Sequence, residues 1–209
     1  IDLGGGFASR NSLKGTYLNT GQFCPDFDQY AQAIADGLAL IQYPDGRLPR
    51  LVLETGRAMV DESGSLLSRV HATKTLSDGR NALVLDAGIN SLFTHFWYNH
   101  DVHPGRPTRG PLSSTVLFGP LCMNIDVIRD AIDFPALRPG DPVVICNVGA
   151  YNVTQWMQFI TYRPAVVLVG SDGRHALLRR REILDDVQGP EQMPDWLLDD
   201  AGSFSRGQN

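Results

Sequence analysis

The chain carries short groups of residues whose types and order could do chemistry together. They are Gly4-Gly5-Gly6, Glu54-Thr55-Gly56-Arg57, Gly119-Pro120-Leu121-Cys122 and Gly149-Ala150-Tyr151. Each group alone is a weak signal. Together they supply a turn that can hold a phosphate, a carboxylate close to a fixed cation, a thiol and a phenol. Such a set suits a phosphorylated cofactor that contains a ring nitrogen.

Each group also has an ordinary structural explanation. The N–H groups of a glycine-rich turn can converge on a phosphate because no Cβ obstructs them, but a plain tight turn has the same sequence. Glu54 and Arg57 could form a structural ion pair. Alternatively, a carboxylate that faces a pyridine nitrogen keeps that nitrogen protonated. Tyr151 follows an apolar run, where a half-buried anchor with a solvated hydroxyl is common.

Length and composition place limits on the function. A chain of 209 residues with 43% hydrophobic and 20% charged residues is typical of a globular protein with one or two domains. The formal net charge of −5 argues against a nucleic-acid or membrane surface built on positive charge. We therefore expect neither nucleic acid nor membrane as a partner.

The cysteines and histidines predict neither a disulfide framework nor a metal site. The three cysteines lack C-x-x-C spacing, which fits a reducing, cytoplasmic location. Cys24 and Cys146 are predicted to be small buried hydrophobes. The histidines near an aromatic stretch are expected at the surface or at a pocket rim: His71, His95, His100 and His103.

The first part of the chain predicts a β/α unit. Residues 1–3 and 51–53 form apolar runs typical of buried parallel strands. Between them, apolar residues at helical spacing predict a helix over residues 27–42 that Asp26 caps. Chemistry at the carboxyl ends of strands is typical of β/α barrels. Residues 1–57 are therefore predicted to be the last pieces of a barrel.

From residue 58 the pattern changes to that of a β domain. Short runs rich in β-branched residues are separated by turn signals such as Asp78-Gly79 and Asp172-Gly173. The runs cover residues 58–60, 66–74, 81–86, 115–118, 142–147 and 165–169. We predict an antiparallel, sandwich-like or barrel-like domain over residues 58–198. Short helices are expected at most over 125–132 and over 179–187, and residues 199–209 are expected to be a mobile tail.

The order and spacing of the motifs resemble the pyridoxal-phosphate-dependent amino-acid decarboxylases of the ornithine and diaminopimelate decarboxylase type. The resemblance runs from Ile1 to about Leu198 and corresponds to the later half of those proteins. It implies an α/β plus β fold of the alanine-racemase-like kind, in which the end of a cofactor-binding β/α barrel precedes an antiparallel β domain. The implied cofactor is pyridoxal 5'-phosphate.

The resemblance also implies roles for the residues that match. Gly4, Gly5 and Gly6 would hold the cofactor phosphate, and Tyr151 would lie beside the cofactor. Glu54 would pair with the ring nitrogen. Arg57 would contact the phosphate or the substrate carboxylate. The family pattern has a proline where this chain has Thr55, a change that spares both charged groups.

The thiol belongs to a string that resembles the family's Gly-Pro-x-Cys-x-x-x-Asp pattern, here with Cys122 and Asp126. In that family the cysteine protonates the carbanion left when carbon dioxide departs, and it reaches into the active site of the neighbouring subunit. The resemblance therefore implies a homodimer with shared active sites.

The expected substrate-binding residues depart from the family pattern. They are Arg57, Tyr98, Asn99, Met123 and Asp126. Diamine-producing relatives carry an acid where this chain has Met123, and ornithine decarboxylases carry Asp where it has Asn99. Diaminopimelate-type enzymes carry Arg at the position of Thr94. Ornithine, lysine and diaminopimelate are therefore doubtful substrates, and a larger, neutral or already conjugated amino acid fits better.

The cofactor lysine of the family has no counterpart here. Lys14 and Lys74 are the only lysines, and neither matches. Because Ile1 reads as part of a strand, we expect upstream residues to be missing and this polypeptide alone to be inactive. Two alternatives stay open: a racemase or epimerase of the same fold, and a non-catalytic binding protein related to the decarboxylases.

Overall fold

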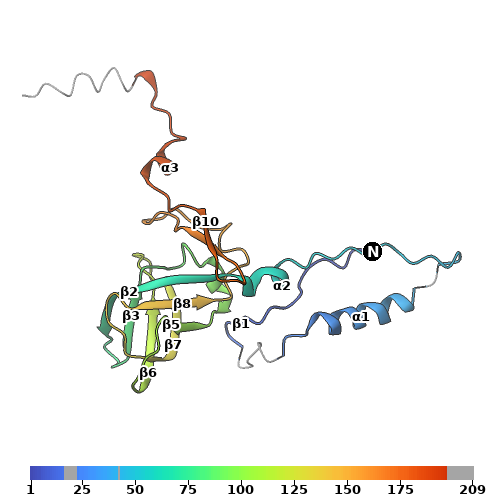
Figure 1. Ribbon diagram of the computed structural model, residues 1–209, viewed down its shortest axis with the longest axis horizontal. Coiled ribbons are helices and arrows are strands. Elements are labelled where there is room, and N and C mark those ends of the chain that lie inside the picture. The colour runs from blue at the N-terminus through green and yellow to red at the C-terminus, as the bar shows by residue number, and fades with distance from the viewer. Residues whose placement is uncertain (17–22, 42, 197–209) are drawn as a thin grey trace, which may run out of the picture. The chain divides into compact units, whose positions relative to one another are not determined.

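A computed structural model describes residues 1–16, 23–41 and 43–196 of the chain (Figure 1). The described part divides into two compact units, of which the first spans Ile1–Met157 and the second starts at Gln158. The predicted mobile tail, residues 199–209, lies outside the described residues.

The first segment has the predicted parallel pairing only as an isolated bridge. The prediction of buried strands over residues 1–3 and 51–53 is wrong, because apolar residues of both runs are exposed, Leu3 to 47% and Leu53 to 40%. Asp2 and Val52 form a parallel bridge, and the Leu3 N–H donates to the Val52 carbonyl over 3.1 Å. Between them lies α1, Phe27–Ala39. The Asp26 side chain caps α1 by accepting from the Gln29 backbone N–H, as expected of an N-cap aspartate. The helix ends three residues before the predicted end, residue 42, which lies outside the described residues.

A helical turn connects this segment to the sheet. α2 (Arg57–Val60) and the 3₁₀ turn η2 (Asp61–Ser63) follow Gly56, which has a φ of 46°. The prediction of a β run over residues 58–60 is therefore wrong. Gly56 turns the chain, and its carbonyl and that of Thr55 accept the N–H groups of Met59 and Ala58. Local hydrogen bonds thus favour a helical turn over residues 58–60, and they outweigh the β propensity of these residues.

A six-stranded, barrel-like sheet forms most of the first unit, in the order β5-β8-β2-β3-β6-β7. Its strands are β2 (Ser65–Thr75), β3 (Asn81–Leu85), β5 (Val102–Pro104), β6 (Leu112–Phe118), β7 (Val127–Pro135) and β8 (Pro142–Cys146). The side chains of Leu85, Leu117 and Ile145 are among those that pack in its core. The sheet is mixed, because β3 and β6 pair in parallel. The prediction of a purely antiparallel domain is wrong in that detail.

The helix predicted over residues 125–132 is also absent from the described structure. Residues 127–135 form β7, which pairs with β6 from Val127 to Pro135. Ile128 and Phe134 enter the core from this strand. Long-range pairing with β6 thus overrides a helical pattern of only two turns.

A short two-stranded sheet ties the segment after the glycine triplet to the β domain. β1 (Ser12–Leu13) pairs with β4 (Tyr98–Asn99), which follows the 3₁₀ turn η3 (Phe93–Phe96). His95 and His100 flank β4 and are 2% and 1% exposed, so the prediction that they lie at the surface or at a pocket rim is wrong. Their burial fits hydrogen bonds of His95 to the Leu92 carbonyl and of His100 to Thr94.

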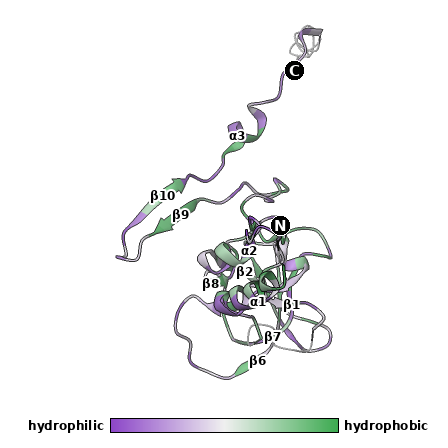
Figure 2. Ribbon diagram, turned by 90° about the vertical axis from the view of Figure 1, so that its right-hand side faces the viewer, coloured by the Kyte–Doolittle hydropathy of each residue, from purple (hydrophilic) through white to green (hydrophobic). Residues whose placement is uncertain are grey.

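The second unit contains an antiparallel hairpin of β9 (Val166–Val169) and β10 (His175–Arg179), then α3 (Leu184–Gln188). The helix predicted over residues 179–187 is present only from Leu184, because Arg179 ends β10 and residues 180–183 are irregular. Figure 2 shows hydrophobic residues along β9 and β10. Within the described residues, no helix is long and apolar enough to cross a bilayer.

Candidate functional site

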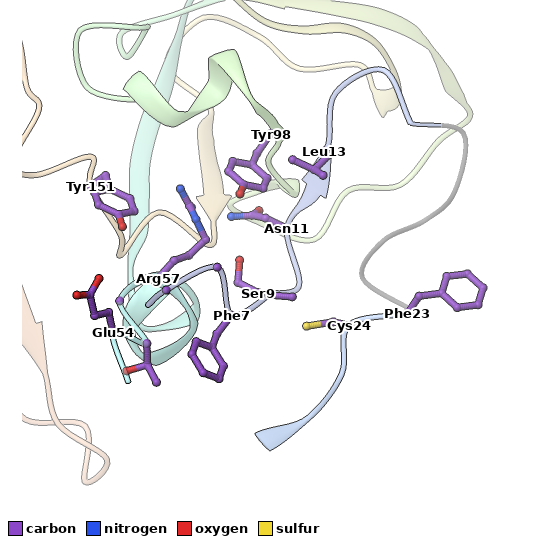
Figure 3. A pocket seen from close by; sticks show the side chains of 15 residues that line it. Phe7, Ser9, Asn11, Leu13, Phe23, Cys24, Glu54, Arg57, Tyr98 and Tyr151 are labelled. Carbon is purple, nitrogen blue, oxygen red and sulfur yellow. The ribbon is translucent and has the colours of Figure 1, made fainter. Parts of the chain in front are cut away.

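A pocket of about 610 Å³ gathers several of the predicted site residues (Figure 3). Its lining comes from the glycine turn and β1, the segments before α1 and α2, β4, and the start of the loop after β8. The lining residues are Gly5, Gly6, Phe7, Ala8, Ser9, Asn11, Leu13, Phe23, Cys24, Glu54, Thr55, Gly56, Arg57, Tyr98 and Tyr151. The topology therefore brings two of the three predicted glycines to one site with the predicted charged and aromatic residues: Gly5, Gly6, Glu54, Arg57, Tyr98 and Tyr151.

The glycine turn lies against the backbone of the second parallel segment. The Glu54 N–H donates to the Gly4 carbonyl over 2.9 Å. A Cβ on Gly5 would lie 2.9 Å from the Glu54 carbonyl oxygen, and Gly4 and Gly6 have φ values of 64° and 82°. These positions therefore favour glycine. The N–H groups of Gly5 and Gly6 have no acceptor among the described residues, so they are available to a ligand in the pocket.

Arg57 pairs with Asp61 and not with Glu54. Arg57 Nη1 lies 3.3 Å from an Asp61 carboxylate oxygen, and the Arg57 side chain is 13% exposed. The guanidinium carbon lies 4.3 Å from the centroid of the Tyr98 ring and 5.0 Å from that of Tyr151. Glu54 forms no ion pair with any described residue. Its charge is thus available to a cationic group in the pocket.

Close backbone contacts bring Tyr151 to the site. Tyr151 adopts a φ of 66°, and its hydroxyl lies 3.5 Å from the position that a Cβ on Gly56 would take. Gly149 approaches the Val60 carbonyl oxygen so closely that a Cβ there would overlap it. Glycine at positions 56 and 149 therefore lets the loop that carries Tyr151 reach α2.

Several pocket residues carry no clear signal in the sequence. Ser9 and Asn11 line the pocket and donate to Asp61, over 2.6 and 2.7 Å. For Asp61 itself, the one signal in the sequence is its i, i+4 spacing from Arg57, which is typical of an ion pair on a helix. Cys24 was expected to be a buried hydrophobe, yet it is partly exposed and lines the pocket.

Five of the predicted site residues lie outside the pocket lining, among them Gly4, whose carbonyl accepts the Glu54 N–H. Cys122 and Met123 are exposed in the turn between β6 and β7. Asn99, in β4, pairs with Ser12 of β1. Asp126 is 2% exposed, and its carboxylate accepts the backbone N–H groups of Ile89 and Leu121, each over 2.8 Å. These bonds give Asp126 a structural role.

Thr94, at the position where diaminopimelate-type relatives are expected to carry Arg, is fully buried. Its hydroxyl lies 2.8 Å from His100 Nε2 and donates to the Asn152 side chain over 3.0 Å. Burial lowers the pKa of His100 to about 4, because the charged imidazolium would lose its hydration. Thr94 therefore belongs to a neutral, buried hydrogen-bond network. In the described part of the chain, no cluster of three His, Cys, Asp or Glu side chains could hold a metal ion.

The chain matches a family model over residues 26–149, that of the pyridoxal-dependent decarboxylase, C-terminal sheet domain. The chain belongs to this decarboxylase family. The matched residues include α1, α2 and the whole six-stranded sheet. Family membership thus confirms the resemblance inferred from the sequence motifs.

Proteins named as diaminopimelate decarboxylases are similar to this chain. It is 30% identical over 176 residues to a diaminopimelate decarboxylase of Helicobacter pylori, covering 83% of this chain and 40% of that protein. It is 31% identical over 205 residues to one of Methanothermobacter thermautotrophicus, covering 95% and 45%. A solved diaminopimelate decarboxylase of M. jannaschii in co-complex with L-lysine is 26% identical, with a TM-score of 0.79 over 94% of this chain and 43% of that one. The chain spans less than half the length of these decarboxylases.

The pocket of this decarboxylase-family chain fits part of a pyridoxal phosphate site. The unused N–H groups of Gly5 and Gly6 suit phosphate oxygens, and a Cβ at Gly5 would force the turn away from Glu54. Glu54, without a cationic partner among the described residues, suits a protonated ring nitrogen. Neither Lys14 nor Lys74 lines the pocket. The residues therefore fit the cofactor's phosphate and ring, and they supply no group for its covalent attachment.

Proposed function

We propose that this chain is part of a pyridoxal-phosphate-dependent amino-acid decarboxylase and that it supplies one wall of the active site. The observation that carries the proposal is that Glu54 lines the same pocket as the glycine turn while Arg57 is paired elsewhere. When bound, pyridoxal phosphate supplies an electron sink for the pair released as the substrate carboxylate leaves.

The pocket residues of the chain have different proposed roles. The N–H groups of the glycine turn bind phosphate, and Glu54 holds a proton on the ring nitrogen through its negative charge. Arg57 offers its unused N–H groups to the phosphate or to the substrate carboxylate. Tyr151 and Tyr98 flank the guanidinium and limit where a ligand can lie.

We further propose that Cys122 protonates the substrate carbon in the active site of a second subunit. The thiol is exposed and lies outside the pocket of its own chain, which supports a role across an interface. A homodimer with shared active sites follows. In this arrangement each complete site takes Glu54 from one subunit and Cys122 from the other.

The proposed substrate is a larger, neutral or already conjugated amino acid. Among the described residues that line the pocket, Glu54 is the only acid. The two positions at which relatives are expected to carry acids are occupied here by Met123 and Asn99. An unpaired distal ammonium in a closed site costs about 2–5 kcal/mol. Diaminopimelate, lysine and ornithine should therefore be poor substrates, although the similar proteins are diaminopimelate decarboxylases.

The experiment needs the product of the whole open reading frame, because neither lysine of this chain lines the pocket. We expect this product to bind pyridoxal phosphate with the absorbance of a Schiff base, and the 209-residue chain alone to be inactive. Carbon dioxide release from a panel of neutral amino acids should exceed that from diaminopimelate, lysine and ornithine in kcat/KM. High activity on any of those three overturns the substrate proposal. Exchange of solvent deuterium into the substrate without carbon dioxide release would identify a racemase instead, and no cofactor binding would favour a binding protein.

A further inference from the structure

Asp61 is a carboxylate that the fold buries directly behind the pocket. Its side chain is 1% exposed. One carboxylate oxygen accepts the Ser9 hydroxyl over 2.6 Å and the Asn11 amide over 2.7 Å, and Arg57 Nη1 approaches the other to 3.3 Å. A buried carboxylate is costly unless it is paired and hydrogen-bonded, so these contacts are needed to keep the charge there.

Three segments that form the pocket meet at this residue. Ser9 and Asn11 belong to the loop after the glycine turn, and Arg57 begins α2. The segment that leads to Tyr151 joins through the backbone, since the Gly149 N–H donates to the Asp61 carbonyl over 2.9 Å. The Asn11 amide adds a bond of 2.9 Å to the Asn147 carbonyl.

Asp61 forms hydrogen bonds with only one nitrogen of the Arg57 guanidinium. Nη1 is the Arg57 nitrogen that bonds to it, and Nε and Nη2 have no acceptor among the described residues. A guanidinium is planar and its N–H groups have fixed directions. Holding Nη1 in place therefore also sets the directions in which the Nε and Nη2 N–H groups point. The rings of Tyr98 and Tyr151 lie against it, as Figure 3 shows.

We propose that Asp61 is a positioning residue, which aims the free edge of Arg57 at an anionic group in the pocket. The pairing also keeps Arg57 away from Glu54, so that each charge serves a different part of the ligand. The inference rests on the proposed function, because it names the anion as the cofactor phosphate or the substrate carboxylate.

The test is a double-mutant cycle between Asp61→Asn and Arg57→Gln in the product of the whole reading frame. Pyridoxal phosphate affinity is measured by absorbance titration, KM and kcat are measured for the best substrate, and thermal stability is followed in parallel. We expect Asp61→Asn to weaken the cofactor affinity or to raise KM about tenfold in the wild-type background, and to change neither in the Arg57→Gln background. Asp61→Glu should recover part of the loss. An equal effect in both backgrounds, or tighter binding by Asp61→Asn, overturns the proposal.

A second variant covers the case in which Asp61→Asn does not fold. Ser9→Ala loosens the other carboxylate oxygen, and its effect on affinity or KM should likewise disappear in the Arg57→Gln background; an effect that persists there overturns the proposal. Failure of the proposed function looks different, because the wild-type product would then bind no cofactor. Asp133→Asn, on an exposed position of β7, is the matched control for the change of Asp to Asn.

Discussion

Gly149 packs directly on the carbonyl oxygen of Val60, at the point where α2 ends. An added Cβ would overlap that oxygen, and it would also meet the Gly64 nitrogen at 3.0 Å. Both neighbours are backbone atoms, which cannot move aside as a flexible side chain can. This contact sets how closely the loop that carries Tyr151 approaches Arg57.

Gly149→Ala should therefore lower the free energy of unfolding by about 1–3 kcal/mol, the range for overpacking a tight contact. Chemical denaturation of the 209-residue chain measures it. Gly37→Ala is the control: it lies inside α1, and the new Cβ would have no atom within 4 Å apart from its chain neighbours and the helix's own backbone. It should raise stability by about 0.5–1 kcal/mol. Equal stability of Gly149→Ala and the wild type would contradict the close contact.

Glu54→Gln should lower kcat at least about a hundredfold, the scale of one well-placed electrostatic group, because a neutral amide no longer favours a proton on the ring nitrogen. Cofactor affinity should change much less, since the glycine turn and Arg57 remain. Steady-state kinetics and absorbance titration of the product of the whole reading frame measure both. Glu62→Gln, an exposed acid in η2, should leave kcat unchanged. A wild-type kcat in Glu54→Gln would refute the role of the carboxylate.

Cys122 can be tested by mixing two inactive homodimers. Glu54→Gln and Cys122→Ala subunits should each be nearly inactive alone. After subunit exchange, half of the dimers contain one intact site, so about a quarter of the wild-type activity should return. Activity that stays at the level of the separate variants would show that Glu54 and Cys122 do not meet across an interface.

Asp126→Asn tests the structural role of that carboxylate. It accepts two backbone N–H groups while buried, and an amide can replace only part of that bonding. We expect a loss of about 1–3 kcal/mol in the free energy of unfolding of the 209-residue chain. Asp133→Asn should have no measurable effect. Unchanged stability together with a raised KM would restore Asp126 as a substrate-binding residue.

Burial of His100 should make the chain less stable in acid. Its pKa is lowered from 6.5 to about 4, so the unfolded chain binds more protons between these values. Its contribution is present above pH 6.5 and falls as the pH drops toward 4, by about 3 kcal/mol in total. Denaturation of His100→Gln between pH 4 and 7 should show a shallower slope than the wild type. His71→Gln, with an exposed imidazole in β2, should keep the wild-type slope.

The sequence alone determined the features that depend on neighbours along the chain. Asp26 and the apolar spacing after it fix where α1 begins, and β-branched runs between turn residues fix β2 and β8. The glycine triplet and Glu54 indicated a candidate pocket because each directly follows an apolar run, and Gly5, Gly6 and Glu54 do line one pocket. Such signals need no knowledge of distant partners.

The tertiary structure decided which of several possible partners each group takes. Arg57 stands three residues from Glu54 and four from Asp61, and only the helical turn after Gly56 selects Asp61. Likewise, β7 is a strand because β6 lies beside it. Hydrogen bonds and ion pairs between distant residues depend on where the backbone brings them, and spacing in the sequence does not specify that position.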